Sequence, residues 1–193
     1  MLITGNINVM LPESAPPALV TVCDELEKYL GMCFSSPKNG TLTEIELLVD
    51  GTLSKEACKL RAAGSRLVIT GGSPRGTLYG VYTLLRDVVG CRFFAADTEF
   101  VPELPPVELP NNFEMSAVPS FEYRDVYWHC AFNEEWGAKN AVNGNHISGM
   151  CERYGGGEGY ALFVHTFNNL LPPDKYFGEH PEYYALTGGG RRP

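Results

Sequence analysis

Positive charge is scarce and unclustered in this chain of 193 residues. Lys and Arg together number 15 against 23 Asp and Glu, which gives a formal net charge of −8. No cluster of five or more basic residues offsets this balance. The resulting field repels phosphate backbones and anionic lipid surfaces. We therefore expect no nucleic-acid partner.

Long apolar runs are also missing. No stretch of eighteen apolar residues occurs, and the first residues, Met-Leu-Ile-Thr-Gly-Asn, lack the basic start and apolar core of a secretory signal. We expect no membrane partner. The same absence predicts a cytoplasmic protein, or one whose natural start has been trimmed.

The six cysteines include no C-x-x-C pair, and several fall inside apolar patterns, as small buried hydrophobic residues do. Free thiols in a reducing compartment are the favoured interpretation. A zinc site that combined Cys130 or Cys151 with His129, His146 or His165 would lack finger-type ligand spacing. We therefore predict no metal and no cofactor.

Motifs for nucleotide binding and for nucleophilic catalysis are absent as well. The turn Thr70–Gly76 lies between a predicted strand and a predicted helix, where backbone N–H groups could hold an anion. It lacks the Gly-Lys-Ser/Thr end of a Walker loop and the three glycines of a dinucleotide fingerprint, so a structural helix start is favoured. No Gly-x-Ser-x-Gly elbow supports serine chemistry, and no cysteine has a local base motif.

The residues that are present indicate a globular α+β protein. Hydrophobic residues make up 44% of the chain and include ten Phe, ten Tyr and two Trp. Residues 1–110 are predicted to form a two-layer α+β domain. Its helices begin at Pro16-Pro17 and at Ser73-Pro74 and end at Gly31 and Gly90. Its strands are predicted over 7–11, 44–49, 55–62, 66–70, 91–94 and 99–101, with 55–62 and 66–70 paired in an antiparallel sheet.

A second region follows a proline-rich connector. The prolines at 102, 105, 106, 110 and 119 disfavour a helix or central strand and place a linker over 111–119. Beyond it we predict several elements: a strand over 120–128, a helix over 134–142, a possible strand over 145–148, a glycine-rich loop over 155–159 and a buried strand over 162–164.

Arg124 and His165 are the first candidates for ligand contact. An arginine in an aromatic strand is costly to bury unless an anion, a carboxylate or a hydroxyl-rich ligand meets its guanidinium group. The alternative is a structural ion pair, with Asp125 as the partner. His165 follows a predicted strand, where ligands are often bound, although a core histidine with an internal hydrogen bond explains it equally well.

Aromatic and acidic residues extend this set of candidates. Trp128 could stack on the apolar face of a sugar, as could Trp136, Tyr127 and Tyr160, although most such rings lie in cores. A carboxylate pair about 5 to 9.5 Å apart is typical of glycoside hydrolysis. Five residues qualify by type alone, and their spacing selects no pair: Asp125, Glu134, Glu135, Glu152 and Glu158. The loop position of Glu158 favours a solvated charge.

Two sets of motifs resemble known families. The string from Leu67 to Ala95, which contains Ile-Thr-Gly-Gly-Ser-Pro-Arg-Gly, resembles the helper domain that precedes the barrel in family 20 and family 67 glycoside hydrolases. The segments 121–128, 136–144, 165–173 and 180–186 resemble the start of the barrel in domain-of-unknown-function family 4838. The resemblance implies a zincin-like, hexosaminidase N-terminal-type domain without metal, followed by a (β/α)8 TIM barrel that acts on glycans.

The resemblance also implies roles for particular residues. An arginine on the first barrel strand holds sugar hydroxyls in family 20, and Arg124 matches it, with Asp125 in place of the usual glycine. Arg124, Asn143, His146 and His165 would lie near the ends of the first barrel strands and contact substrate. The catalytic carboxylates of the related hydrolases come from later strands, so we assign no catalytic residue.

Chain length limits what residues 120–193 can build. A complete barrel takes about 200 residues or more, and about 75 follow position 118 (193 minus 118). We expect an incomplete barrel whose open edge allows self-association. The chain is thus predicted to be the N-terminal portion of a hexosaminidase- or glucuronidase-related glycoside hydrolase-like protein, inactive alone. The alternative is a non-catalytic carbohydrate-binding or scaffolding module in which Arg124, Trp128 and His165 hold a sugar.

Overall fold

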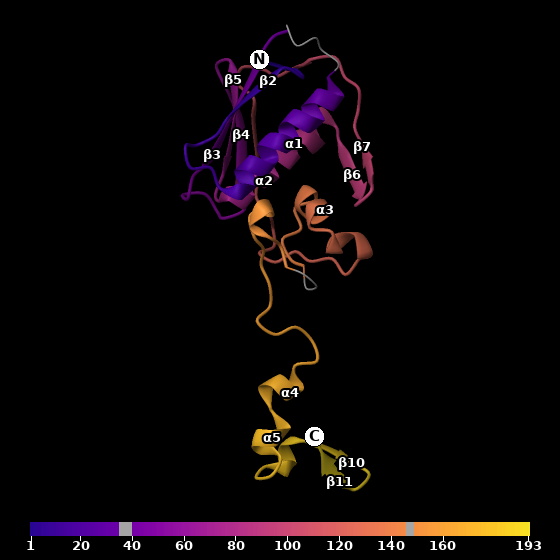
Figure 1. Ribbon diagram of the computed structural model, residues 1–193. Coiled ribbons are helices and arrows are strands. Elements are labelled where there is room, and N and C mark those ends of the chain that lie inside the picture. Colours follow the sequence, from indigo (N-terminus) through magenta and orange to yellow (C-terminus); the bar gives the residue numbers. More distant parts are fainter. Residues whose placement is uncertain (35–39, 146–148) are drawn as a thin grey trace. The chain divides into compact units, whose positions relative to one another are not determined.

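The computed structural model describes residues 1–34, 40–145 and 149–193, which divide into two compact units. The first unit covers Met1–Gly159 and contains the main sheet and the long helices. The second covers Tyr160–Pro193 and consists of short helices and a hairpin (Figure 1). The protein has a mixed α/β architecture.

A five-stranded sheet forms the centre of the first unit, in the order β2-β3-β5-β4-β9. Strands β2, β3 and β5 run parallel, and β4 is antiparallel to both of its neighbours. The predicted antiparallel pairing of β4 and β5 is confirmed, but the sheet as a whole is mixed and not antiparallel. The helix after β2 is a crossover connection that returns the chain to the end of the sheet where β2 starts. β3 therefore runs in the same direction as β2. The strands are β2 (Ile7–Met10), β3 (Thr43–Val49), β4 (Cys58–Ala63), β5 (Arg66–Gly71) and β9 (Glu114–Ala117).

Two helices pack against each other and against this sheet. Helix α1 (Pro17–Cys33) begins with proline as predicted, but it continues two residues past Gly31. Helix α2 (Pro74–Thr83) begins at the predicted cap, where the Ser73 hydroxyl accepts the Gly76 N–H at 3.1 Å. It continues as a π-helix over Leu84–Val89 and ends at Gly90 with φ 95°. The core lies between helices and sheet and includes Leu19, Val22, Leu26, Ile45, Leu47, Leu60, Leu67, Ile69, Leu78 and Val81.

Four shorter strands form two small antiparallel pairs. Strand β1 (Leu2–Ile3) pairs with β8 (Val107–Glu108), and β6 (Arg92–Ala95) pairs with β7 (Thr98–Phe100). The two strands predicted at 91–94 and 99–101 are thus confirmed. They form a hairpin of their own instead of joining the main layer, because Phe93 packs edge-on against Tyr29 of α1 at 5.4 Å.

The predicted linker contains a strand. β9 lies inside residues 111–119 and pairs with β4 at the edge of the main sheet, where an extended proline-flanked segment can pair on one side only. The segment up to Gly159 belongs to the same compact unit as this sheet. The division of the chain at residue 110 stays a prediction.

The segment after β9 differs from the expected strand and helix. Residues 120–127 form no strand, because Arg124 bonds the Asn143 side chain and the turn at 143–144 instead of a neighbouring strand. Helix α3 (Glu134–Lys139) is capped by Asn133 and ends before the predicted position 142. Gly144 forms an isolated parallel bridge with Glu158. The possible strand at 145–148 lies largely outside the described residues.

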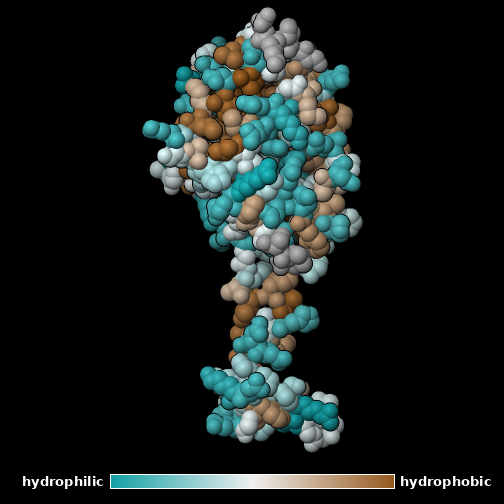
Figure 2. Space-filling model, in the orientation of Figure 1, coloured by the Kyte–Doolittle hydropathy of each residue, from teal (hydrophilic) through white to brown (hydrophobic). Residues whose placement is uncertain are grey.

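The second unit has no strand where one was expected. Leu162, Phe163 and Val164 are exposed, and Figure 2 shows the stretch before α4 as hydrophobic surface. Val164 and His165 have φ values of 36° and 51°, which interrupt an extended backbone. The prediction of a buried strand here is therefore wrong. The unit's elements are α4 (Phe167–Leu170), α5 (Pro173–Tyr176) and the antiparallel strands β10 (Ala185–Thr187) and β11 (Gly190–Arg192).

Candidate functional site

Five polar residues meet where the segment after β9 packs on the sheet and α2. Glu56 precedes β4, and Arg75 lies in the first turn of α2. Arg124, Asn143 and Glu158 come from the later segment of the same unit. We call these five residues the Glu56 cluster.

Glu56 is the centre of this cluster, and only 9% of its surface is exposed. Its Oε2 accepts a hydrogen bond from Arg124 Nη2 at 2.5 Å, and its Oε1 accepts one from Asn143 Nδ2 at 2.8 Å. The same Oε1 lies 2.6 Å from Arg75 Nε. This last contact is an ion pair without an aligned N–H, since Nε has no hydrogen-bond acceptor. One buried carboxylate therefore balances two guanidinium groups, as burial of such charges requires.

The guanidinium group and the backbone N–H of Arg124 all donate hydrogen bonds to groups within the protein. Its Nε donates to the Ala141 carbonyl at 2.7 Å, and its Nη1 donates to the Phe121 carbonyl at 2.6 Å. The Arg124 backbone N–H donates to Asn143 Oδ1 at 2.7 Å. The ion pair of Arg124 is with Glu56, whereas Asp125, the partner expected from the sequence, accepts a hydrogen bond from the Tyr123 hydroxyl at 2.8 Å. Arg124 thus holds its own segment against the sheet.

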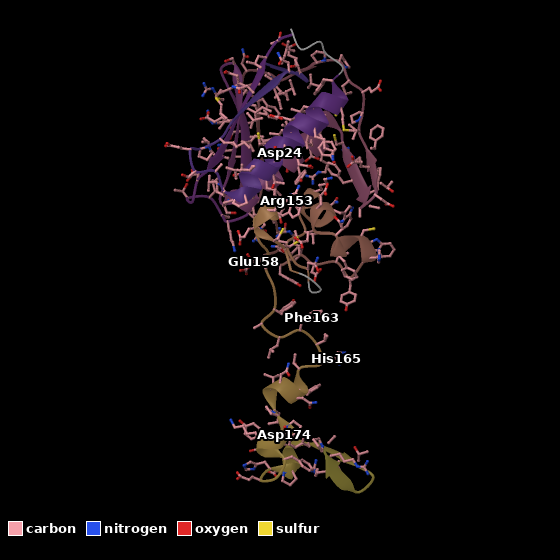
Figure 3. The ribbon with its side chains drawn as sticks, viewed as in Figure 1. Asp24, Arg153, Glu158, Phe163, His165 and Asp174 are labelled. Atoms are coloured by element: carbon pink, nitrogen blue, oxygen red, sulfur yellow. The ribbon has the colours of Figure 1, made fainter. Side chains whose placement is uncertain are left out.

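Glu158, which Figure 3 labels, is held in place by two cations. Its Oε1 lies 2.6 Å from Arg75 Nη2 and pairs with Lys55 Nζ as well. These hydrogen bonds, from Lys55 first and Arg75 second, lower the pKa of Glu158. The expectation of a solvated loop charge is therefore wrong. A carboxylate whose pKa is lowered suits binding or structure and not general-acid catalysis, which needs a raised pKa.

A glycine permits this approach. Gly155 has φ 83°, and its carbonyl accepts a hydrogen bond from Arg75 Nη1 at 3.3 Å. A Cβ at this position would lie 2.6 Å from Cβ of Arg75. The glycine-rich loop therefore serves to bring Glu158 to Arg75.

Two cavities flank Glu56. One has a volume of about 270 Å³ and the other about 220 Å³, and Val118 and Pro119 also line both. The larger combines charged groups with the ring of Phe121, and the smaller is bordered by Arg124 and Tyr79. Both could admit a small polar ligand.

Exposed aromatic rings lie just beyond Arg124. Trp128 is 63% exposed, and Tyr127 is exposed as well. Tyr127 packs edge-on against Phe132 with centroids 6.2 Å apart, and His129 does so at 6.4 Å. We call Tyr127, Trp128, His129 and Phe132 the ring group. It presents aromatic faces to solvent, as sugar-binding surfaces do.

The predicted site residues separate into three sets. Arg124 and Asn143 lie together, and Trp128 follows them on the surface. His146 lies outside the described residues. His165 is exposed and belongs to the second unit (Figure 3). Sequence reasoning missed Glu56, which no motif marks, and it noticed Arg75 only as part of a turn.

A second charged cluster surrounds Lys139, which is 7% exposed. Its Nζ lies 2.6 Å from Glu135, 3.6 Å from Glu99 and 3.8 Å from Glu25, and it donates to the Tyr29 hydroxyl at 2.8 Å. Burial raises the pKa of Glu25, although Lys139 opposes the shift. This cluster ties α3 to α1 and to the β6–β7 hairpin.

No group of three or more His, Cys, Asp or Glu residues in the described part of the chain is arranged to hold a metal ion. In the same ranges, every helix is too short or too polar to span a bilayer.

Comparison with families of known sequence finds one match. The family described as Domain of unknown function (DUF4838) matches residues 93–193, which is just over half of the chain. No curated protein matches.

Several solved structures are similar, and those described below are glycoside hydrolases. One is BtGH115A, a GH115 4-O-methyl-α-glucuronidase specific for decorated arabinogalactans, with 18% identity over 65% of this chain and a TM-score of 0.48. Another is a GH138 enzyme that targets pectin rhamnogalacturonan II, with 19% identity over 62% and a TM-score of 0.40. A third is the GH20 exo-β-N-acetylglucosaminidase of Vibrio harveyi in complex with N-acetylglucosamine, with 19% identity over 65% and a TM-score of 0.33. The matches cover 19%, 12% and 17% of those chains, so this chain spans less than a fifth of each.

Proposed function

The chain belongs to the family described as Domain of unknown function (DUF4838), and on this basis we propose that it is the N-terminal portion of a glycoside hydrolase-like protein that acts on glycans. In this proposal the first unit contains the helper domain, and the segment after β9 begins a barrel. The related activities would be those of hexosaminidases or glucuronidases, as the resemblance of residues 67–95 implies. The proposed division of labour is that this chain contacts the glycan and does not cleave it.

The exposed ring of Trp128 is the observation that carries the proposal. The indole of Trp128 is 63% exposed beside other exposed rings, so it presents apolar area that a ligand could cover. Stacking on the apolar face of a sugar ring is one way to cover it. The adjacent Tyr127 and His129 widen the aromatic surface that a sugar chain would meet.

Arg124 and Asn143 have a positioning role in this proposal. Their mutual hydrogen bond and their shared partner Glu56 anchor the backbone four residues before Trp128. Any direct contact of Arg124 with a sugar would be made through the 220 Å³ cavity that it borders. Ligand contacts by His146 and His165, and self-association through an exposed edge, stay predictions.

The absence of cleavage is proposed from the state of the acids near this site. Glycoside hydrolysis needs one carboxylic acid with a raised pKa and one free carboxylate. Glu56 and Glu158, the two acids that meet Arg75, are both ion-paired, and the pKa of Glu158 is lowered. Such a pair is suited to holding a structure and not to protonating a leaving group.

The test is glycan binding by the purified chain. Oligosaccharides that contain N-acetylhexosamine or glucuronic acid should bind, and Trp128→Ala should weaken binding by about threefold to tenfold. Phe94→Ala is the matched control, because Phe94 has the same 63% exposure but lies on β6. Equal effects of the two substitutions would contradict the assignment of Trp128.

Cleavage is measured in parallel with aryl glycosides of the same two sugars. No turnover is expected, and turnover by the purified chain would refute the non-catalytic role. Binding to no glycan at all would favour a scaffolding module instead.

A further inference from the structure

Two cysteines that are distant in sequence meet in the core of the first unit. Cys33 and Cys91 are 58 positions apart, and their Sγ atoms lie 3.8 Å from each other. Both residues are free thiols, and neither exposes any surface. The pair joins the end of α1 to the start of the β6–β7 hairpin, and these elements lie side by side (Figure 1).

We propose that Cys33 and Cys91 are a disulfide-forming pair, which closes when the protein folds or opens locally in contact with a disulfide oxidant such as glutathione disulfide. The inference does not depend on the proposed function. It assigns a covalent modification site to two residues that sequence spacing alone does not connect.

The geometry requires only a small adjustment. A disulfide bond is about 2.05 Å long, so the two sulfur atoms must approach by less than about 2 Å. Cys33 is the last residue of α1, and Cys91 stands between Gly90 and β6. A shift at these two positions therefore occurs at element ends and leaves the interior hydrogen bonds of helix and hairpin intact.

Neighbouring hydrogen bonds keep the pair aligned. The Cys91 N–H donates to the Leu85 carbonyl at 2.8 Å, and the Cys33 carbonyl accepts the Leu104 N–H at 2.8 Å. The backbone of each cysteine is thus tied to a different part of the fold. The two thiols face each other through the packing of the core and not through a flexible loop.

The reaction is an exchange in two steps. A thiolate of one cysteine attacks glutathione disulfide and displaces one glutathione thiolate, and the second cysteine thiolate then attacks the mixed disulfide and displaces the other. One S–S bond breaks in the oxidant, and one forms between Cys33 and Cys91. The two thiol protons pass to the two released glutathione thiolates, so the protein is oxidised by two electrons and glutathione disulfide is reduced.

Burial of the two thiols controls how fast the disulfide forms. Burial, the neighbouring Cys33 and Glu99 together raise the pKa of Cys91 to about 12, and burial also raises the pKa of Cys33. The thiolate, which is the attacking species, is therefore rare in the closed fold. The bond should form readily during folding under oxidising conditions and slowly in the folded, reduced protein.

The experiment refolds the full chain with glutathione disulfide in excess over glutathione and compares it with chain refolded under reduction. The free-thiol count after unfolding should fall from six to four, since two enter the bond. Peptide mapping should find Cys33 linked to Cys91. The oxidised chain should melt about 5 °C or more above the reduced one, because the bond restricts the unfolded chain.

Two variants complete the test. Cys33→Ser should abolish both the linked peptide and the gain in melting temperature, whereas the double substitution Cys23→Ser, Cys151→Ser, which removes thiols outside the pair, should retain both. If Cys33→Ser fails to fold, the peptide map of the unaltered chain decides by itself. Six free thiols under oxidation, a different pairing, or a lower melting temperature of the linked chain would each overturn the proposal.

Discussion

Glu56 and Arg124 form an ion pair that spans 68 positions of sequence, with Arg124 Nη2 donating to Glu56 Oε2 at 2.5 Å. The contact joins the residue before β4 to the segment that carries the ring group. Because Glu56 also pairs with Arg75, its loss leaves two guanidinium groups without their shared carboxylate. Glu56 is thus one of the side chains that couple the main sheet and α2 to the later segment, alongside the contacts of Arg75 with Gly155 and Glu158.

Replacing Glu56 by glutamine should therefore be costly. Breaking a buried ion pair by removing one partner typically costs about 3 to 5 kcal/mol, and we expect Glu56→Gln to lower the free energy of unfolding by that amount in urea denaturation. Glu114→Gln is the control, because it breaks only the exposed pair with Lys59 and should cost far less. A loss at Glu56 no larger than at Glu114 would show that the cluster does not stabilise the fold.

Lys139→Met should destabilise the packing of α3 against α1. It removes the cation that faces Glu25, Glu99 and Glu135, and we expect a loss of about 3 kcal/mol near pH 7. Burial already raises the folded-state pKa of Glu25, so this residue disfavours folding as pH rises and takes up a proton as pH falls.

The loss at Lys139 should consequently be smaller at pH 5 than at pH 7, because acidification favours the protonated form of Glu25, whose pKa burial raises. Urea denaturation at both pH values measures this difference, and Lys59→Met serves as the exposed control. A loss that grows on acidification would contradict the assigned role of Glu25.

Glu158 should contribute to the acid sensitivity of the fold. Lys55 and Arg75 hold its folded-state pKa below the ordinary value of 4.5. Its stabilising effect is therefore fully present above about that pH and is lost as pH falls through the lower folded-state pKa. Stability measured from about pH 6 to pH 3 should decline less steeply in Glu158→Gln than in the unaltered chain. Glu27→Gln, at an exposed position of α1, is the matched control for the loss of one carboxylate, and equal slopes in Glu158→Gln and the unaltered chain would refute the prediction.

Gly71→Ala should lower the stability of the fold strongly, although it adds only one methyl group. A Cβ at Gly71 would lie 1.9 Å from the Thr77 backbone nitrogen, where β5 meets α2, and backbone atoms cannot move aside cheaply. We expect a loss of about 3 kcal/mol or more by thermal or urea unfolding. Gly51→Ala meets nothing within 4 Å and should change stability by less than about 0.5 kcal/mol. Tolerance at Gly71 would mean that β5 and α2 are less closely packed than described.

Local patterns predicted the elements that depend on neighbouring residues. The proline starts of α1 and α2, the Ser73 cap, the Gly90 stop and the β4–β5 turn all follow from interactions within a few positions. The segment 120–128 looked like a strand by the same reasoning, because its aromatic residues are typical of strands. It is not one, since a strand needs a partner backbone and Arg124 bonds to a side chain and a turn.

The sequence by itself determined that the chain is globular with both helices and strands, where α1 and α2 begin and where the β4–β5 turn lies, because composition, caps and local spacing act over short range. Only the tertiary structure decided the parallel pairing of β2, β3 and β5, the partnership of Arg124 with Glu56, the ion pairs of Glu158 and the contact of Cys33 with Cys91. These contacts join residues tens of positions apart. Which distant groups meet depends on how helices and strands pack around the core, and no local pattern specifies that arrangement.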